Sequence, residues 1–201
     1  MTYNYMRIGG VKWDAPEGWL QKVAEFIPFM RKELEGFHQL VSGNEIVLNR
    51  TQGIGRYDKE LAFQYGLSGP MLRCTGVQFD LRKDEPYSIY DRFDFDVPTE
   101  QEGDIYARYR VRLAEIEESL KIVEQALAQI PATGEFMAKV PRIIRPPKGE
   151  AYVRIESPKG EIGCYIKSEG KPKPDRLKFR RPSFANLQIL PELLRGSHMG
   201  D

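Results

Sequence analysis

Apolar side chains recur at steps of three and four residues along residues 19–42. The stripe runs from Trp19 to Val41 and predicts a long amphipathic helix. Asp14 is a candidate N-cap a few residues before it, and Pro28 lies inside it, where a proline bends a helix. We therefore expect one kinked helix that ends at about residue 42.

A second stripe follows in the middle of the chain. Its apolar positions step by three or four from Ile105 to Leu127 and predict a helix from about Asp104 to Gln129. The opposite face of this helix carries charged residues, namely Arg108, Arg112, Glu115, Glu118 and Lys121. We interpret that face as solvated or partner-facing, and Glu115 with Glu118 as surface residues that do not form an acid–base pair.

Two shorter helices are predicted between the long ones, at residues 44–51 and 57–65, around a glycine turn. The pair Gly53-x-Gly55 has the look of a phosphate-binding loop. A dinucleotide fingerprint, however, needs a preceding strand and a third glycine in register, and residue 58 is Asp. A tight turn is the better interpretation.

Residues 66–98 have no clear periodicity and are rich in Gly, Arg, Asp and Tyr. Only residues 93–98 alternate between apolar and polar side chains, which predicts a brief extended segment. Ordered but irregular segments of this kind often carry interface or site contacts.

The pattern changes to period two after a linker, residues 131–150, that is rich in proline and basic residues. Residues 152–167 predict a β-hairpin around Ser157-Pro158-Lys159-Gly160, residues 176–180 predict a third strand, and residues 182–195 predict a helix with Ser183 as N-cap. The expected buried face of the hairpin consists of Val153, Ile155, Ile162, Cys164 and Ile166.

These elements predict a mainly α fold with a small antiparallel β-sheet. Residues 1–130 form a helical region that includes the irregular segment 66–98, and residues 131–150 form the linker. Residues 151–181 form the sheet, and residues 182–201 start a further helical region.

Composition adds limits on the possible partners. Of 201 residues, 41% are hydrophobic and 29% charged, with a formal net charge of +1, so no overall field attracts nucleic acid. The basic run at residues 171–181 fits a sheet with one solvated face better than an RNA site. No stretch reaches the ~18–20 apolar residues of a membrane span. Cys74 and Cys164 are interpreted as a loop thiol and a core residue.

The chain shows no self-contained catalytic, metal-binding or phosphate-binding pattern. His38 lies in the first long helix and is interpreted as a solvated or half-buried helix residue, since a metal site needs further ligands at suitable spacing. His198, in the segment Gly196-Ser197-His198-Met199, is given no catalytic role. We therefore expect the chain to act as one piece of a larger assembly.

Several short motifs, in the same order, resemble the D subunit of respiratory complex I, in its cyanobacterial and plastid form above all. This is the large subunit of the quinone-reducing module and is related to nickel–iron hydrogenase large subunits. The motifs are Arg7-x-Gly9-Gly10-Val11, Leu67-Ser68-Gly69-Pro70-Met71-Leu72-Arg73, Asp80-Leu81-Arg82-Lys83, Pro158-Lys159-Gly160-Glu161, Pro182-Ser183-Phe184 and Asn186-Leu187-Gln188-Ile189-Leu190-Pro191.

The resemblance implies a helical-bundle fold and a role in electron transfer. Members of this family pack against the subunit that holds the terminal iron–sulfur cluster, and the two form the chamber where quinone is reduced at the membrane edge. The family's quinone-gripping residues lie in an amino-terminal region that this chain lacks, so we expect a central fragment, inactive alone. It is expected to bind no cofactor itself and to lie on the cytoplasmic or stromal face of the membrane, with NADH or ferredoxin as donor.

The residues expected to matter are contact residues, with no catalytic or metal-binding residue among them. A loop that faces the iron–sulfur subunit consists of Arg7, Gly9 and Gly10. A second set fixes an interface through charge-assisted hydrogen bonds and consists of Arg73, Asp80, Arg82 and Lys83.

Thr2 departs from the family pattern, because many members have a histidine at this position, near the cluster. A histidine there would couple the cluster's electron affinity to proton uptake. We therefore expect a lower, less pH-dependent cluster potential, suited to menaquinone or plastoquinone. Redox titration at several pH values tests this, and a steep pH dependence would contradict it.

Two alternatives stay open. One is the large subunit of a membrane-bound nickel–iron hydrogenase-like complex. Such subunits hold their metals with two Cys-x-x-Cys pairs near the chain ends, outside this stretch. The other is a non-catalytic interaction module, in which the stripe Ile105–Leu127 docks a partner helix.

Overall fold

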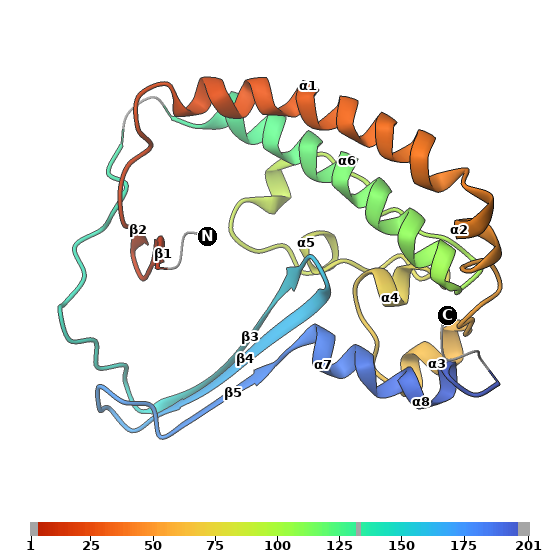
Figure 1. The fold of residues 1–201 in the computed structure, drawn as a ribbon. Coiled ribbons are helices and arrows are strands. Elements are labelled where there is room, and N and C mark those ends of the chain that lie inside the picture. Colours follow the sequence, from red (N-terminus) through yellow and green to blue (C-terminus); the bar gives the residue numbers. More distant parts are fainter. Residues whose placement is uncertain (1–3, 132–133, 197–201) are drawn as a thin grey trace.

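The computed structural model describes residues 4–131 and 134–196, to which all structural statements refer. Two long helices lie side by side along one edge, and a three-stranded sheet lies along the other (Figure 1). Short helices join the two parts at one end of the molecule. The fold is therefore mainly α with a small antiparallel sheet, as predicted.

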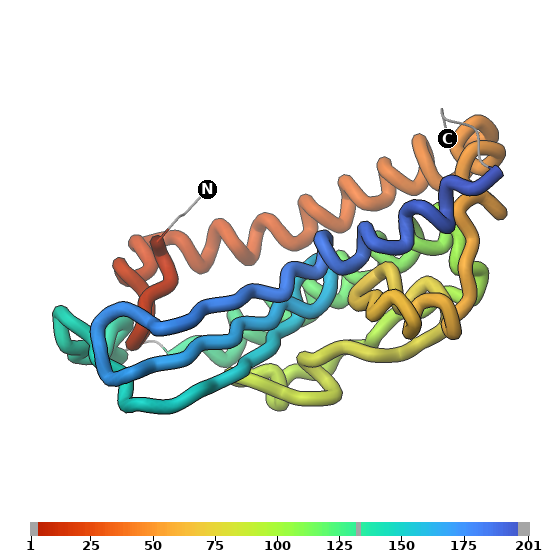
Figure 2. The backbone as a smooth tube through the Cα atoms, turned by 90° about the horizontal axis from the view of Figure 1, so that it is seen from below, coloured from red at the N-terminus to blue at the C-terminus, as the bar shows by residue number. Residues whose placement is uncertain are grey.

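The helices are α1 (Trp19–Phe37), the π-helical turn η1 (His38–Ser42), α2 (Glu45–Asn49), α3 (Lys59–Gln64), α4 (Pro70–Arg73), α5 (Leu81–Asp84), η2 (Tyr90–Arg92), α6 (Ile105–Gln129), α7 (Pro182–Asn186), η3 (Leu187–Ile189) and α8 (Leu190–Leu193). The strands are β1 (Met6–Arg7), β2 (Gly10–Val11), β3 (Gly149–Ser157), β4 (Gly160–Ser168) and β5 (Arg176–Arg180). Strands β3, β4 and β5 form one antiparallel layer with β4 in the centre (Figure 2).

Helix α1 begins later than the sequence indicates. It starts at Trp19 after Gly18, which has φ +74° and provides no side-chain cap. The predicted N-cap at Asp14 is wrong, since the Asp14 carboxylate accepts only from the neighbouring Ala15 N–H. The helix then continues through η1 to Ser42, close to the predicted end.

Helix α6 begins as predicted, because the Asp104 carboxylate accepts from the Ala107 N–H at 2.7 Å. Its apolar stripe packs against α1 of the same chain. The alternative in which this stripe docks a helix of another protein is therefore wrong. The first apolar cluster, between α1 and α6, consists of Ile27, Leu34 and Leu120, with Met30, Leu113, Ile116, Val123 and Leu127 packed against it.

The polar face of α6 is only partly solvated, which corrects the expectation for Arg108 and Glu115. Ala107 and Val111 on this side belong to a second apolar cluster, so α6 is buried on two sides. Arg108 is buried and the Glu115 side chain is only 15% exposed. The second cluster consists of Tyr57, Ala62, Leu67, Leu72, Cys74, Ala107, Val111 and Ile189.

The sheet turns its polar face inward, which also differs from the prediction. Val153 and Ile155 share a face with Cys164 and Ile162 as expected from the register, but they are 61% and 39% exposed. The inward face is held by ion pairs and hydrogen bonds of Arg154, Glu156, Glu161 and Arg180. Burial of these charged groups is possible because each finds a partner.

The expected helix at residues 182–195 is divided into α7, η3 and α8, and the predicted cap is wrong. Arg181 precedes the first residue of α7, and Ser183 lies within that helix without a capping hydrogen bond. Pro191 lies in the first turn of α8, and a proline removes the N–H that a continuous helix needs. The side chain of Asn186 is buried and binds Ser68.

The irregular segment 66–98 contains α4, α5 and η2, and residues 93–100 belong to no helix or strand, with Phe93 in an extended conformation. Side chains of α6 replace the missing strand partner. The Asp94 N–H donates to Gln125 Oε1 and the Asp96 N–H donates to Glu118 Oε2, both at 2.8 Å. Glu118 therefore supports the fold and is not a freely solvated carboxylate.

The two cysteines exchange their expected places. Cys74, expected in a loop, is fully buried in the second cluster, and Cys164, expected in the core, is half-buried on the exposed face of the sheet. The Cys74 thiol is buried because it follows α4 directly, and α4 packs on α6.

Candidate functional site

Arg73 lies at the centre of a buried ionic cluster in the middle of the molecule. It is the last residue of α4, and its side chain is 2% exposed. Arg73 Nε donates to Glu115 Oε1 of α6 at 2.6 Å, and Nη1 donates to Glu156 Oε1 of β3 at 3.0 Å and to the Phe79 carbonyl at 2.8 Å. One guanidinium thus connects three separate parts of the fold.

Asp80 and Arg82 complete the cluster. Asp80 caps α5 by accepting from the Arg82 N–H, and the Arg82 guanidinium binds the same carboxylate through Nη2 at 2.7 Å and Nε at 3.0 Å. Such bidentate pairs fix direction as well as distance. Arg82 also lies over the rings of Tyr90 and Phe95, at 5.9 and 5.1 Å from their centroids.

The approach of β3 to α4 depends on close backbone packing between two turns. The loop before α4 meets the β3–β4 turn, where the Glu161 N–H donates to Ser68 Oγ at 3.1 Å. Gly69 has φ +66°, and a Cβ there would lie 2.5 Å from Gly160 Cα. Only glycine allows this approach, which brings Glu156 to Arg73.

The charges of the cluster do not balance. With every group ionised, Arg73 and Arg82 carry two positive charges against three negative ones on Asp80, Glu115 and Glu156. Burial alone would raise the pKa of Asp80, but the hydrogen bonds and charge of Arg82 outweigh it and hold that pKa below its usual range. Burial raises the pKa of Glu115 and of Glu156, against the opposing charge of Arg73. A proton taken up by the cluster therefore goes to one of the two glutamates.

A cavity of about 380 Å³ lies beside the cluster. Arg112 of α6 lines it together with Arg73, Arg82, Glu115 and Glu156, and its Nη1 donates to the Arg108 carbonyl at 2.8 Å. Desolvation lowers the pKa of Arg112. The cavity walls thus combine cationic and carboxylate groups that can bind water, exchange protons or receive a polar group.

A second buried arginine holds the glycine turn. Arg108 Nη1 donates to the Gly55 and Gly103 carbonyls, both at 3.0 Å, and Asp104 Oδ2 accepts from the Gly53 N–H at 2.8 Å. Gly53 and Gly55 have φ of +72° and +57°. The prediction of a tight turn is confirmed.

The predicted loop of Arg7, Gly9 and Gly10 lies in a different place from the cluster. Strands β1 and β2 pair around it, and the loop packs on the linker through an Ala138 N–H that donates to the Gly9 carbonyl at 2.9 Å (Figure 1). Arg7 is exposed, and its Nε donates to the Asn4 carbonyl at 2.8 Å. The two sets of residues that the sequence analysis names separately therefore also lie apart in the fold.

Within the second predicted set, three residues are brought together and one is not. Arg73, Asp80 and Arg82 make charge-assisted hydrogen bonds within this chain. Lys83 is exposed, with its Nζ 4.6 Å from the Phe95 ring centroid. A contact of these residues with another subunit stays a prediction.

Glu115, Glu156 and Arg112 are functional candidates that residue patterns missed. The residue pattern places Glu115 on a solvated or partner-facing face and gives Glu156 no role. A buried arginine needs carboxylate partners, but their positions depend on tertiary packing. His38 is exposed as expected, with Nδ1 3.0 Å from Ser42 Oγ. Thr2 and His198 lie outside the described residues.

No group of three or more His, Cys, Asp or Glu side chains within residues 4–131 and 134–196 is arranged to hold a metal ion. In the same part of the chain, no helix has the length and apolar character needed to cross a membrane.

Comparison with known proteins identifies the family to which the chain belongs. The family model described as the 49 Kd subunit of respiratory-chain NADH dehydrogenase matches residues 1–148 and 139–201. The chain therefore belongs to this family.

Curated relatives agree with the family assignment. The chain is 67% identical over 201 residues to proteins named as the D subunit of NADH-quinone oxidoreductase from Bacillus mycoides and Bacillus anthracis. The alignment covers 100% of this chain and 55% of each relative, so the chain spans about half the length of these proteins.

A solved structure has the same fold. It is described as the membrane-bound sulfane sulfur reductase, an archaeal respiratory membrane complex. The matched chain is 38% identical, with a TM-score of 0.92 over 98% of this chain and 55% of that chain. The helices and sheet described above thus recur together in one chain of a respiratory complex.

Proposed function

We propose that the chain is part of the quinone-module large subunit of an NADH-quinone or ferredoxin-quinone oxidoreductase. There it helps to form the quinone-reduction chamber beside the terminal iron–sulfur cluster, in a complex that couples electron transfer to proton translocation. The observation that carries this proposal is the 67% identity, over the whole chain, to proteins named as the D subunit of NADH-quinone oxidoreductase.

The buried cluster supports a scaffold role for this chain in that complex. Arg73 connects α4, α6 and β3 and holds these three elements in a fixed arrangement. In our proposal the iron–sulfur cluster is bound by a neighbouring subunit, quinone binds between subunits, and this chain itself binds no cofactor. The complex would hold the chain at the cytoplasmic or stromal face of the membrane.

The loop of Arg7, Gly9 and Gly10 is our candidate contact with the iron–sulfur subunit. Its tip is exposed, with Ile8 69% accessible, while its base is fixed to the linker by backbone hydrogen bonds. An exposed tip on a fixed base is suited to docking, because little conformational freedom is lost on binding.

A different acceptor is the second candidate, because the solved relative is named a sulfane sulfur reductase. The same fold therefore occurs in a respiratory complex whose name specifies sulfane sulfur. The identity of 38% to that chain, against 67% to the quinone oxidoreductase subunits, favours quinone.

The proposal is tested by Arg82→Ala in the complete subunit, with Lys83→Ala as matched control. Loss of Arg82 leaves the buried Asp80 carboxylate without its bidentate partner, whereas Lys83 is exposed. We expect Arg82→Ala to impair assembly or quinone reductase activity, and Lys83→Ala to leave both near the wild-type level. Normal assembly and activity of Arg82→Ala would contradict the role of the cluster.

A further inference from the structure

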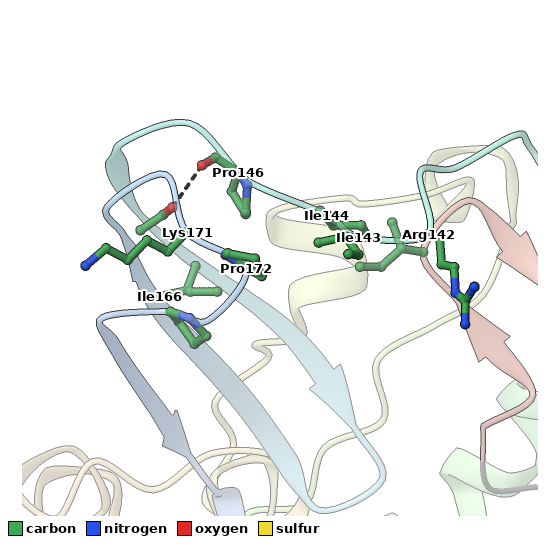
Figure 3. A pocket seen from close by; sticks show the side chains of 10 residues that line it. Arg142, Ile143, Ile144, Pro146, Ile166, Lys171 and Pro172 are labelled. Atoms are coloured by element: carbon green, nitrogen blue, oxygen red, sulfur yellow. Dashed lines mark hydrogen bonds between the residues drawn. The ribbon is translucent and has the colours of Figure 1, made fainter.

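An apolar groove lies between the N-terminal loop, the linker and the far end of the sheet. It encloses about 450 Å³, and four isoleucines form its apolar lining: Ile8, Ile143, Ile144 and Ile166. Figure 3 shows Ile143 and Ile144 on the linker side and Ile166 with Pro172 on the opposite side. We call it the isoleucine groove.

Hydrogen bonds hold the walls of the isoleucine groove in place. Ser168 at the end of β4 is buried, and its hydroxyl donates to the Pro146 carbonyl of the linker at 3.0 Å, which is the dashed line in Figure 3. The Gly170 N–H donates to the same hydroxyl at 3.1 Å. Prolines 146, 172 and 174 further restrict the backbone. A groove with fixed walls binds with a smaller entropy loss.

The rim of the isoleucine groove is cationic. Arg142 and Lys171 lie at opposite ends of the lining, and their charged groups point away from its apolar centre (Figure 3). The carboxylates of this end of the sheet are engaged by two other lysines: Glu169 by Lys148, and Glu150, Glu169 and Asp175 by Lys167. Within the described residues 142–148 and 167–176, the basic side chains that have no carboxylate at ion-pair distance are Arg142, Arg145, Lys171, Lys173 and Arg176.

We propose that the isoleucine groove binds an acidic segment of another protein subunit, with one or more apolar side chains in the cavity and carboxylates on the rim. The partner's carboxylates would pair with the cations that have no carboxylate at ion-pair distance among the described residues, chiefly Arg142 and Lys171. The proposal rests on the proposed function only in taking the partner from the same complex.

The shape of the site favours a protein segment over a lipid surface. Peripheral proteins that enter a bilayer present protruding aromatic and aliphatic side chains on a convex face. Here the apolar side chains line a hollow between two walls, and the charged groups stand at its ends. Such a hollow accepts side chains from a partner, and complementary charges on the rim select an acidic one.

Photo-crosslinking in the assembled complex identifies the occupant. Benzoylphenylalanine is placed at Ile143 in the groove and, as control, at Lys59 on α3, which is exposed and outside the groove. After irradiation, the adduct is identified by mass spectrometry. We expect the position-143 adduct to be a peptide of another subunit with a surplus of Asp and Glu, different from any adduct at position 59.

Charge reversal gives a second measurement. Arg142→Glu with Lys171→Glu should lower the yield of the position-143 adduct about fivefold. An exposed ion pair changes a binding constant by up to about fivefold. Lys59→Glu should leave the yield unchanged.

The possible outcomes separate the two proposals. A lipid adduct, a peptide without acidic surplus, no adduct, or a yield that charge reversal does not change would overturn the groove proposal. Quinone reductase activity, measured on the same samples, reports separately on the proposed function. An active complex with the wrong adduct therefore contradicts the groove alone.

Discussion

Arg73 Nε lies 2.6 Å from Glu115 Oε1, although the two residues are 42 positions apart in the chain. The first ends the short helix α4 and the second lies midway along α6. The same guanidinium binds Glu156 of β3. The Arg73 side chain therefore joins the helical part to the sheet.

Removal of Arg73 should destabilise the complete subunit strongly. Arg73→Ala removes the ion-pair partner of the buried Glu115 and Glu156 carboxylates, and breaking a buried pair in this way costs about 3–5 kcal/mol. Urea unfolding of the purified subunit measures the loss. Arg31→Ala is the matched control, because Arg31 also pairs with two glutamates but at the surface, where solvent screens the interaction. Equal losses of unfolding free energy in the two variants would show that burial of the Arg73 ion pairs does not raise their contribution to stability.

Stability should fall as pH rises through the range where the two glutamates titrate. Burial raises the folded-state pKa of Glu115 and Glu156 above the usual value of 4.5, so the folded state binds protons more tightly than the unfolded state. Their contribution is complete below pH 4.5 and is lost as pH rises through the folded pKa. Asp80 has a lowered pKa, so its contribution is lost only in stronger acid.

Glu115→Gln isolates this effect, because the amide oxygen can still accept from Arg73 Nε. We expect the midpoint temperature of unfolding to fall less steeply with pH in Glu115→Gln than in the wild type. Glu124→Gln is the control, since that carboxylate is at the surface and its pKa is lowered by Arg31. A wild-type slope in Glu115→Gln would show that this carboxyl does not exchange the proton.

The contact between the two turns should be sensitive to one methyl group. A Cβ on Gly160, which has φ +120°, would lie 2.6 Å from Ser68 Oγ and 2.7 Å from the Ser68 carbonyl carbon. Gly160→Ala should cost about 3–4 kcal/mol from backbone strain and overpacking together. Gly170→Ala is the control, because Gly170 has φ +78° but no atom within 4 Å of the added Cβ, so only strain of about 1–2 kcal/mol applies. Similar unfolding free energies for the two variants would show that the turns can separate freely.

The long helices and the sheet could be predicted from residue patterns, because their signals are local. The stripe of α6 and the cap at Asp104 determine that helix within a few residues. The alternation in β3 and β4 similarly gave the hairpin and its turn. The direction in which each face points was not predictable in the same way.

Val153 and Glu156 show why. An alternating strand has two faces, and the hydrophobic rule assigns the apolar one to the core. In this chain the buried arginine of α4 offers a partner to Glu156, so the polar face turns inward and Val153 stays exposed. That partner lies 83 positions away, and only the tertiary fold brings it close.

The separation of the two candidate sites was not predictable for the same reason, namely that it depends on the tertiary fold. Arg7 and Arg73 both belong to motifs of one family, which gives no distance between them. In the structure, Arg7 lies in a loop fixed on the linker and Arg73 lies in the buried cluster. Contacts with other subunits depend on surfaces of those subunits, so neither the residue pattern nor the packing of this chain predicts them.

The most direct test of the account is the rate of quinone reduction by membranes that lack the subunit containing this chain. The gene is deleted, and reduction of a soluble quinone analogue is measured with NADH and with reduced ferredoxin as donors. We predict that deletion abolishes the rate with one of these donors, and that the wild-type protein restores it while the Arg73→Ala variant does not. An unchanged rate with both donors after deletion would contradict the proposed function.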